Sequence, residues 1–119
     1  FHLKNGPDCT LAEFCDMVAQ TADLMGVDKL GIGTDLCQNQ PLSILEWMRN
    51  GRWSKQMDYG EGNKSNADWP KPLSWFKDSR DFPNLTSGLL ERGFNKREVT
   101  QIMGDNWLNF FEKSLTKKP

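Results

Sequence analysis

The residue best placed for chemistry is an aspartate that follows a short apolar run rich in glycine. Residues 29–40 read KLGIGTDLCQNQ, so leucine and isoleucine alternate with glycine before Asp35, and Cys37 follows two positions later. Such a run is typical of a buried strand. A carboxylate at the end of a strand either transfers protons during catalysis or caps the following turn. The pattern alone leaves both roles open for Asp35.

The other residue types that commonly form sites give little support for one. Cys9, Cys15 and Cys37 are an odd number of cysteines without CxxC spacing, which argues against a zinc finger and against a disulfide framework. We expect Cys15 to be a small core residue. His2 is the only histidine and cannot form a metal site by itself.

Composition indicates an ordinary globular domain or part of one. The chain has 119 residues, of which 37% are hydrophobic and 26% charged, with a formal net charge of -1. This charge argues against a nucleic acid or an anionic membrane as partner, and no apolar run approaches the ~18 residues of a membrane span. Because the chain opens on Phe1 rather than on Met, its start says nothing about localisation.

The elements that must position Asp35 can be read from the preceding residues. Thr10 and Glu13 form a capping-box pattern, and apolar residues then recur at three- and four-residue steps. This spacing predicts an amphipathic helix over residues 11–25 that ends at Gly26. The apolar run after Gly26 predicts a strand over residues 29–35. A helix, a glycine turn and a buried strand in this order form half of a repeating α/β unit.

The remainder divides into a long loop and a helical end. Residues 36–83 are rich in Gly, Asn, Ser, Asp and Pro, yet carry several aromatic residues and a short helix that ends at Gly51. We expect most of the tryptophans to anchor this loop, while Arg49 and Arg52 are candidates to bind a substrate carboxylate. Residues 84–119 predict a helix that starts at Asn84 and ends at Gly93 and a second that starts at Asn95, with Glu98 three positions on, and ends at Gly104. Asp105 then caps the last of these helices. Their expected core residues are Leu89, Leu90, Ile102, Met103, Trp107 and Phe110.

A single strand buried on both faces needs neighbouring strands that this chain does not supply. Only residues 1–3, FHL, could add the end of another strand. The sequence therefore predicts either the C-terminal piece of a larger α/β protein or a chain that pairs with another copy of itself.

Three blocks of sequence, taken together, resemble a known family. DKLGIGTD, then FPNLTSGLLERGF, then IMGDNWLNFF occur in this order, with a long loop between the first two. They resemble the C-terminal part of the membrane (renal) dipeptidase family, which are binuclear zinc peptidases of the amidohydrolase superfamily built on a (β/α)8 barrel. WMRNGRW and WPKPLSWF in the loop resemble a bacterial branch, which implies a bacterial soluble protein, cytoplasmic or periplasmic.

The resemblance assigns a place in the barrel to each part of the chain. Residues 1–35 are the last βα unit, ending in strand eight, residues 36–83 the loop, and residues 84–119 the terminal helices. Asp35 matches the family's proton shuttle, which contacts the hydroxide held between two zinc ions while a dipeptide is hydrolysed. The zinc ligands lie on earlier strands, so we expect this fragment to hold no zinc and to be inactive by itself.

One departure from the family pattern and two alternatives bear on this interpretation. Many family members carry a second acid where this chain has Cys37, which affects substrate preference, so another amide or a lactam is an open substrate. Asn106 lies where the family has an asparagine at the start of its last helix, and we expect it to form a cap or a backbone hydrogen bond. A stand-alone helical interaction or assembly module without catalysis is the alternative from a different class. Under either interpretation, a homo-oligomer is among the expected partners.

Overall fold

The computed structural model describes residue 3 and residues 5–50, 62 and 66–116, and these are mainly helical. In chain order the elements are η1 (Gly6–Asp8), α1 (Leu11–Met25), η2 (Val27–Lys29), α2 (Leu42–Asn50), η3 (Ser79–Asp81), α3 (Phe82–Arg92), α4 (Lys96–Thr100), η4 (Gln101–Asp105) and α5 (Asn106–Leu115). No helix in this described part is long and apolar enough to cross a membrane.

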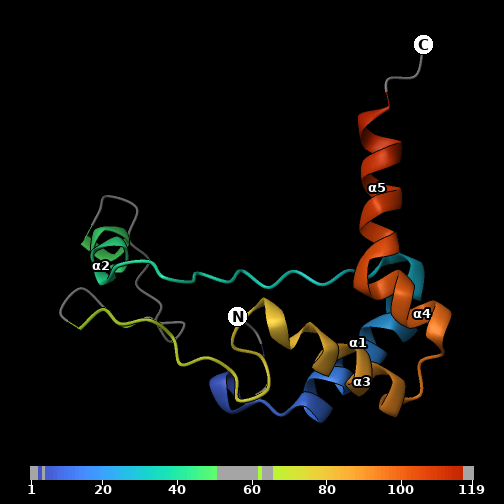
Figure 1. Ribbon diagram of the computed structural model, residues 1–119, viewed down its shortest axis with the longest axis horizontal. Helices are drawn as coiled ribbons and strands as arrows, with labels where there is room; N and C mark the ends of the chain where they lie inside the picture. The colour runs from blue at the N-terminus through green and yellow to red at the C-terminus, as the bar shows by residue number, and fades with distance from the viewer. Residues whose placement is uncertain (1–2, 4, 51–61, 63–65, 117–119) are drawn as a thin grey trace.

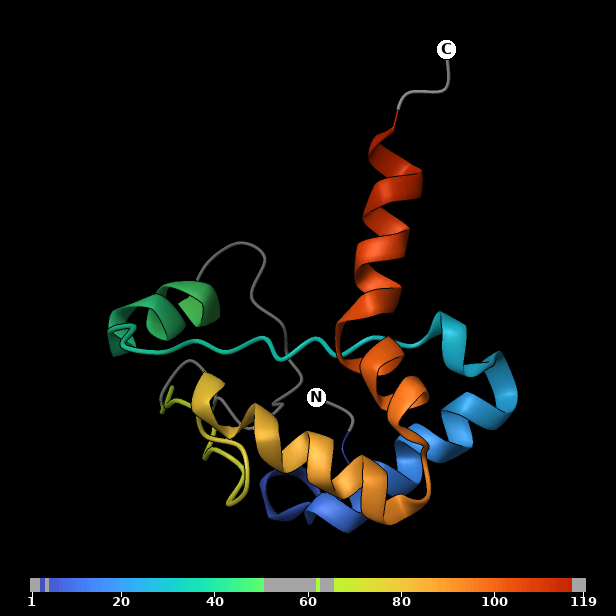
Figure 2. The same cartoon turned by 45° about the vertical axis from the view of Figure 1, so that its right-hand side comes forward.

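A small helical body forms around α1 and α3, which lie side by side in both ribbon views (Figures 1 and 2). Gly88 of α3 allows this approach, because a Cβ there would lie 2.8 Å from Leu11 Cγ and 2.9 Å from Cys15 Sγ. The buried core consists of Cys15, Leu89, Val99 and Ile102. The prediction that Cys15 is a core residue is thus confirmed.

The helix ends of the body follow the local sequence closely. Thr10 Oγ1 accepts from the Glu13 amide at 3.2 Å, and Glu13 Oε2 accepts from the Thr10 amide at 2.9 Å, which forms the predicted capping box. Asn95 and Glu98 form a second capping box at α4. Gly93 ends α3 in the left-handed conformation with φ 109°.

The predicted helix end at Gly104 is wrong. The chain continues from α4 into α5 through η4, one π-helical turn, and Gly104 lies inside that turn. Gly104 does not have the positive φ that ends α3 at Gly93, and Asp105 makes no side-chain cap. Since Gly is tolerated inside a helix, its occurrence did not by itself require a stop.

The segment predicted as the last barrel strand is extended but does not form a strand in the described structure. Val27–Lys29 turns as η2, and the chain leaves the body in an extended conformation from Leu30, with φ -100° and ψ 143°. Asp35, with φ 50°, and a turn at residues 38–39 precede α2. We call residues 30–50 the arm; its extended part crosses the centre of Figure 1 in teal. No described residues pair with it, and a strand is defined by hydrogen bonds to a neighbour. Of the expected seventh strand, Phe1 and His2 lie outside the described residues.

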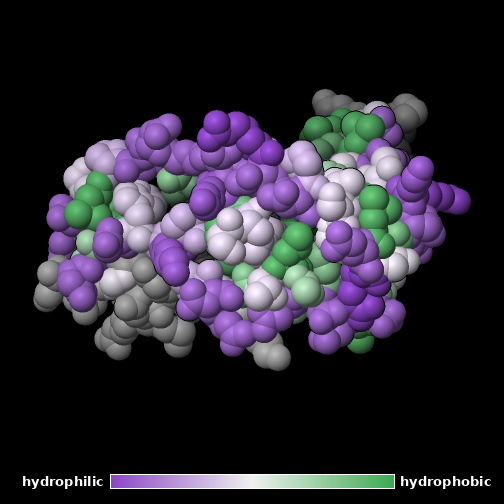
Figure 3. All heavy atoms as spheres, turned by 60° about the horizontal axis from the view of Figure 1, so that its bottom comes forward, coloured by the Kyte–Doolittle hydropathy of each residue, from purple (hydrophilic) through white to green (hydrophobic). Residues whose placement is uncertain are grey.

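The molecule is open rather than compact. Its radius of gyration is 17.1 Å, whereas a globular chain of this length has about 13.5 Å. Three expected core residues are exposed: Leu90 by 41%, Trp107 by 43% and Phe110 by 56%. Apolar side chains reach the surface at the right-hand end, where α5 projects (Figure 3). The apolar face of α5 was correctly recognised, but no described residues cover most of it.

Candidate functional site

Asp35 lies on the arm, at the edge of an open hollow. Its side chain is exposed and its backbone is left-handed with φ 50°, which is uncommon for a residue with a Cβ and marks the turn out of the extended segment. The hollow has a volume of about 550 Å³. Its lining residues are Asp35, Leu36, Cys37, Gln38, Gln40, Ile44, Met48 and Trp69.

The root of the arm is held on the helical body by residues of α5. Asn106 Nδ2 donates to the carbonyl oxygens of Val27 and Leu30, both at 2.7 Å. This is the backbone hydrogen bonding that the sequence predicted for Asn106. Trp107 Nε1 donates to the Ile32 carbonyl at 3.1 Å. Asp35 is therefore placed three residues beyond the last of these contacts.

The glycines of the arm have different surroundings. A Cβ on Gly31 would lie 2.8 Å from Trp107 Cε2, so only glycine lets the indole lie on this backbone. Gly33 has nothing within 4 Å of a Cβ. Another part of the described chain therefore approaches the arm closely at Gly31 and not at Gly33.

A second hollow, of about 240 Å³, lies between α1 and the arm root. Its walls are nearly all apolar, formed by Phe14, Met17, Val18, Thr21, Leu30, Gly31, Ile32, Gly33 and Ile102. It contains no titratable side chain, so it offers packing surface rather than a reactive site.

The two candidate arginines are not seen next to Asp35. Arg49 is buried, 4% exposed, on α2, and it is not among the residues that line the Asp35 hollow. Arg52 lies outside the described residues. A role for either arginine in binding a substrate carboxylate stays a prediction.

The three cysteines are free, and they differ in exposure. Cys9 and Cys15 are buried, and desolvation, with a contribution from Glu13 at Cys9 and from Asp16 at Cys15, raises the pKa of each thiol. Cys37 is exposed and lines the hollow beside Asp35. A thiol reagent should therefore react first at Cys37.

Part of the long loop is anchored on the body as expected. Trp75 Nε1 donates to the Cys9 carbonyl at 2.8 Å, and the Trp75 ring lies 5.3 Å from that of Phe14. Asn84 Nδ2 donates to the Trp75 carbonyl at 2.8 Å. Trp47 of α2, by contrast, is 76% exposed. Trp53 and Tyr59 lie outside the described residues.

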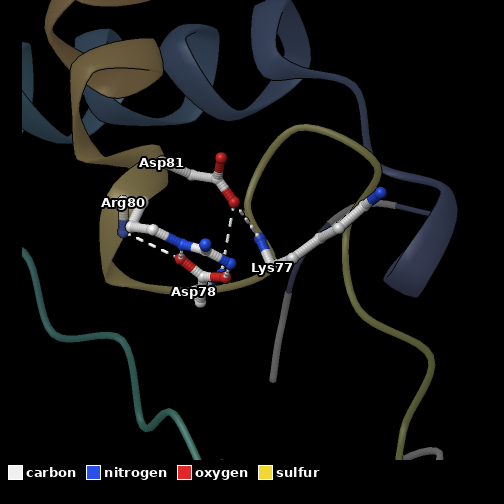
Figure 4. A network of polar contacts seen from close by, with 4 residues as sticks. All are labelled: Lys77, Asp78, Arg80 and Asp81. Atoms are coloured by element: carbon white, nitrogen blue, oxygen red, sulfur yellow. Dashed lines mark hydrogen bonds and ion pairs between the residues drawn. The ribbon is translucent and has the colours of Figure 1, made fainter.

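A polar network fixes the turn between this loop and α3 (Figure 4). Arg80 donates from Nε and Nη2 to the two oxygens of Asp78, at 2.9 Å and 2.6 Å. Asp81 Oδ2 accepts from the amides of Lys77 and Asp78. The side-chain bond from Arg80, followed by the Arg80 amide, lowers the pKa of Asp78 to about 2. These bonds are local, so the network is a helix-start structure and not a second site.

The described residues do not form a metal-binding cluster. No three His, Cys, Asp or Glu side chains among them gather closely enough to hold a metal ion. His2 lies outside the described residues. The zinc pair implied by the family resemblance therefore finds no ligand set in this part of the chain.

Comparison with known proteins gives one informative similarity. The chain is similar to a solved structure of an amidohydrolase from Pseudomonas aeruginosa, with a TM-score of 0.72 and 31% sequence identity. The match covers 90% of this chain but only 31% of the amidohydrolase. No family model and no curated protein matches. The structural match supports the amidohydrolase resemblance and does not distinguish the dipeptidase family within it.

Sequence reasoning did not identify the walls of the Asp35 hollow. Ile44 and Met48 lie one helical turn apart on α2, and Trp69 comes from the loop about twenty residues later. The i, i+4 spacing of Ile44 and Met48 is a visible signal for one apolar face. Nothing in the sequence indicates that this face meets Trp69 rather than a core.

Proposed function

We propose that this chain is the C-terminal part of a zinc-dependent dipeptidase of the amidohydrolase type, with Asp35 as its proton carrier. The similarity to an amidohydrolase at 31% identity supports the hydrolase class. The position of Asp35, exposed at the edge of a hollow and three residues beyond the anchored root of the arm, is the observation that carries its assignment.

The chemistry assigned to Asp35 follows from its carboxylate. Hydrolysis of an amide adds water to the carbonyl carbon and breaks the C–N bond, so one proton must move from the water to the leaving nitrogen. A carboxylate Oδ within hydrogen-bond reach of both can accept this proton and then donate it to the departing amine. Asp35 ends this cycle deprotonated, as it began.

The rest of the reaction depends on residues outside this chain. Zinc, when bound, would supply an activated water, and its ligands belong to other parts of a complete barrel. Since the chain spans about a third of the amidohydrolase that it matches, we propose that the isolated 119 residues hydrolyse nothing. The exposed apolar face of α5 is a surface that the missing part would cover.

The test is Asp35→Asn in the longer parent protein, assayed with dipeptides together with metal analysis. Removing a general acid–base group should lower kcat by about 100-fold or more and leave the zinc content unchanged. Asp23→Asn is the matched control, because Asp23 is exposed on α1 and far along the chain from the hollow. Full activity in Asp35→Asn would overturn the assignment.

The alternative of a stand-alone interaction module makes a different prediction. It requires the 119-residue chain to be soluble and to unfold cooperatively without metal. Exposed Trp47, Leu115 and the apolar face of α5 are features that an assembly surface would share. Two measurements decide between a dipeptidase fragment and a stand-alone module. One is the sedimentation and denaturation of the isolated chain, and the other is the intact mass of the protein produced from its source gene.

A further inference from the structure

The hollow beside Asp35 has one acidic edge and an apolar wall. Ile44 and Met48 line it from one face of α2, and Trp69 lines it from the loop. The side-chain amides of Gln38 and Gln40 and the thiol of Cys37 complete the lining, none of them charged. Among the described lining residues, Asp35 is thus the one carboxylate of a mostly apolar recess of about 550 Å³.

We infer that this recess is a specificity site that binds the side chain of the substrate residue released as the free amine, and that it selects an apolar side chain there. This inference rests on the proposed function, since it uses the position of Asp35 relative to the reacting amide. It extends that function by identifying which residue of the substrate is selected and which residues of the protein select it.

The position of the leaving residue follows from the proton transfer. If Asp35 donates a proton to the departing nitrogen, that nitrogen lies within hydrogen-bond reach of Asp35 at bond cleavage. The Cα of the released residue is bonded to that nitrogen, so its side chain also begins near Asp35. The recess that opens from Asp35 is then the space available to this side chain.

The preference for an apolar side chain follows from the wall. Contact with Ile44, Met48 and Trp69 removes apolar surface from water, which favours side chains such as leucine or phenylalanine. A carboxylate in the same place would lose hydration, since the described lining residues include no cation, and it would also lie near Asp35. We therefore expect an acidic leaving residue to be rejected most strongly.

The kinetic test uses the parent protein and substrates that differ only in the leaving residue. We expect kcat/KM for glycyl-phenylalanine to exceed that for glycyl-glycine by about tenfold or more, with glycyl-aspartate lowest. Met48→Asp should lower the ratio of kcat/KM for glycyl-phenylalanine to kcat/KM for glycyl-glycine by about tenfold. Met48 is 49% exposed, so this change should be tolerated by the fold.

Trp47→Ala is the matched control for the kinetic test. Trp47 precedes Met48 on α2, is 76% exposed, and does not line the recess, so its replacement should leave the substrate ratio unchanged. A ratio in Met48→Asp equal to that of the unaltered protein would overturn the inference. The inference would also be overturned if Trp47→Ala lowered the substrate ratio as much as Met48→Asp does.

A binding test separates this inference from the proposed catalysis. Iodoacetamide should alkylate Cys37 first, which peptide mapping and Cys37→Ser confirm, because Cys9 and Cys15 are buried. Free phenylalanine at millimolar concentration should slow this alkylation by twofold or more, and aspartate should not. Equal rates with both amino acids would overturn the inference even if Asp35→Asn is inactive. A different outcome is that phenylalanine but not aspartate slows the alkylation of Cys37 while Asp35→Asn is fully active. That outcome would overturn the proton role of Asp35 and would leave the recess as an apolar binding site.

Discussion

The helical body and the arm both carry apolar residues but differ in how they bury them. In the body, α1 and α3 cross at Gly88, and Cys15, Leu89, Val99 and Ile102 are sealed from water. Along the arm, Leu30 and Ile32 are half-buried at the root, Leu45 is buried on α2, and Leu42, Trp47 and Met48 are exposed at the far end. The body completes its own core, whereas the arm buries Leu45 and Arg49 on α2 and leaves Leu36, Trp47 and Met48 exposed.

The difference lies in how each region satisfies its backbone. A helix forms its hydrogen bonds within itself, so the body is structured by local residues plus one layer of packing. An extended segment needs a partner on each side. Asn106 and Trp107 provide side-chain donors that hold the root of the arm on the body.

The largest expected effect is the loss of a core side chain from the body. Leu89 is fully buried, so Leu89→Ala should destabilise the protein by about 2–5 kcal/mol through lost burial and a residual cavity. Leu24→Ala is the matched control, because Leu24 is 85% exposed on α1 and should change stability by less than about 0.5 kcal/mol. Denaturant unfolding followed by circular dichroism measures both, and equal effects would mean that the body is not the cooperative core.

A second prediction concerns the joint between the arm and the body. Gly31→Ala places a Cβ against the Trp107 indole and should cost about 1–3 kcal/mol, or displace the arm root. Gly33→Ala, two residues along, meets nothing and should be close to neutral. Unfolding curves and the fluorescence of Trp107 compare the pair. Equal changes in stability for Gly31→Ala and Gly33→Ala would argue against the contact between α5 and the arm.

The hydrogen bonds at the same joint should contribute less. Asn106→Ala removes donors to the Val27 and Leu30 carbonyls, and we expect a loss of about 1 kcal/mol because water can reach these half-buried groups. Asn109→Ala, on an exposed position of α5, is the control. Faster hydrogen exchange in residues 27–33, without a change in α3, would show that the effect is confined to the joint.

The smallest effect is electrostatic and belongs to the start of α3. The pKa of Asp78 is lowered to about 2, chiefly by Arg80, so its carboxylate stabilises the folded protein above about pH 4. That contribution should fade as the pH falls from about 4 toward 2. Arg80→Ala should return the pKa of Asp78 toward its ordinary value, while Arg97→Ala should not. NMR titration of the carboxyl carbon measures the shift, and an unaltered pKa in Arg80→Ala would contradict the assigned cause.

Local patterns predicted most of the body correctly. The Thr10 and Asn95 capping boxes and the left-handed Gly93 each depend on residues within a few positions of one another. The start of α3 at Phe82 lies two residues before the predicted one, because Pro83 fits the first turn of a helix. The prediction of a helix end at Gly104 was wrong because a glycine can either end a helix or lie inside a helical turn.

The candidate site was predicted only in part. Asp35 was identified from the apolar run before it, and the similarity to an amidohydrolase supports the class of chemistry but does not test this residue. The prediction of a strand over residues 29–35 was wrong for the described structure, because alternating apolar residues indicate an extended backbone but not its hydrogen-bond partner. The recess walls were missed because Trp69 meets α2 through a long loop.

The sequence by itself determined where α1 begins and ends, how α4 is capped, and which faces of the helices are apolar, because these depend on side chains three or four residues apart. Only the tertiary structure decided which apolar faces are buried, that Trp107 lies on Gly31, and that Asp35 shares a recess with Met48 and Trp69. Such contacts join residues far apart in the chain, and their formation depends on how all the elements pack together rather than on any local pattern.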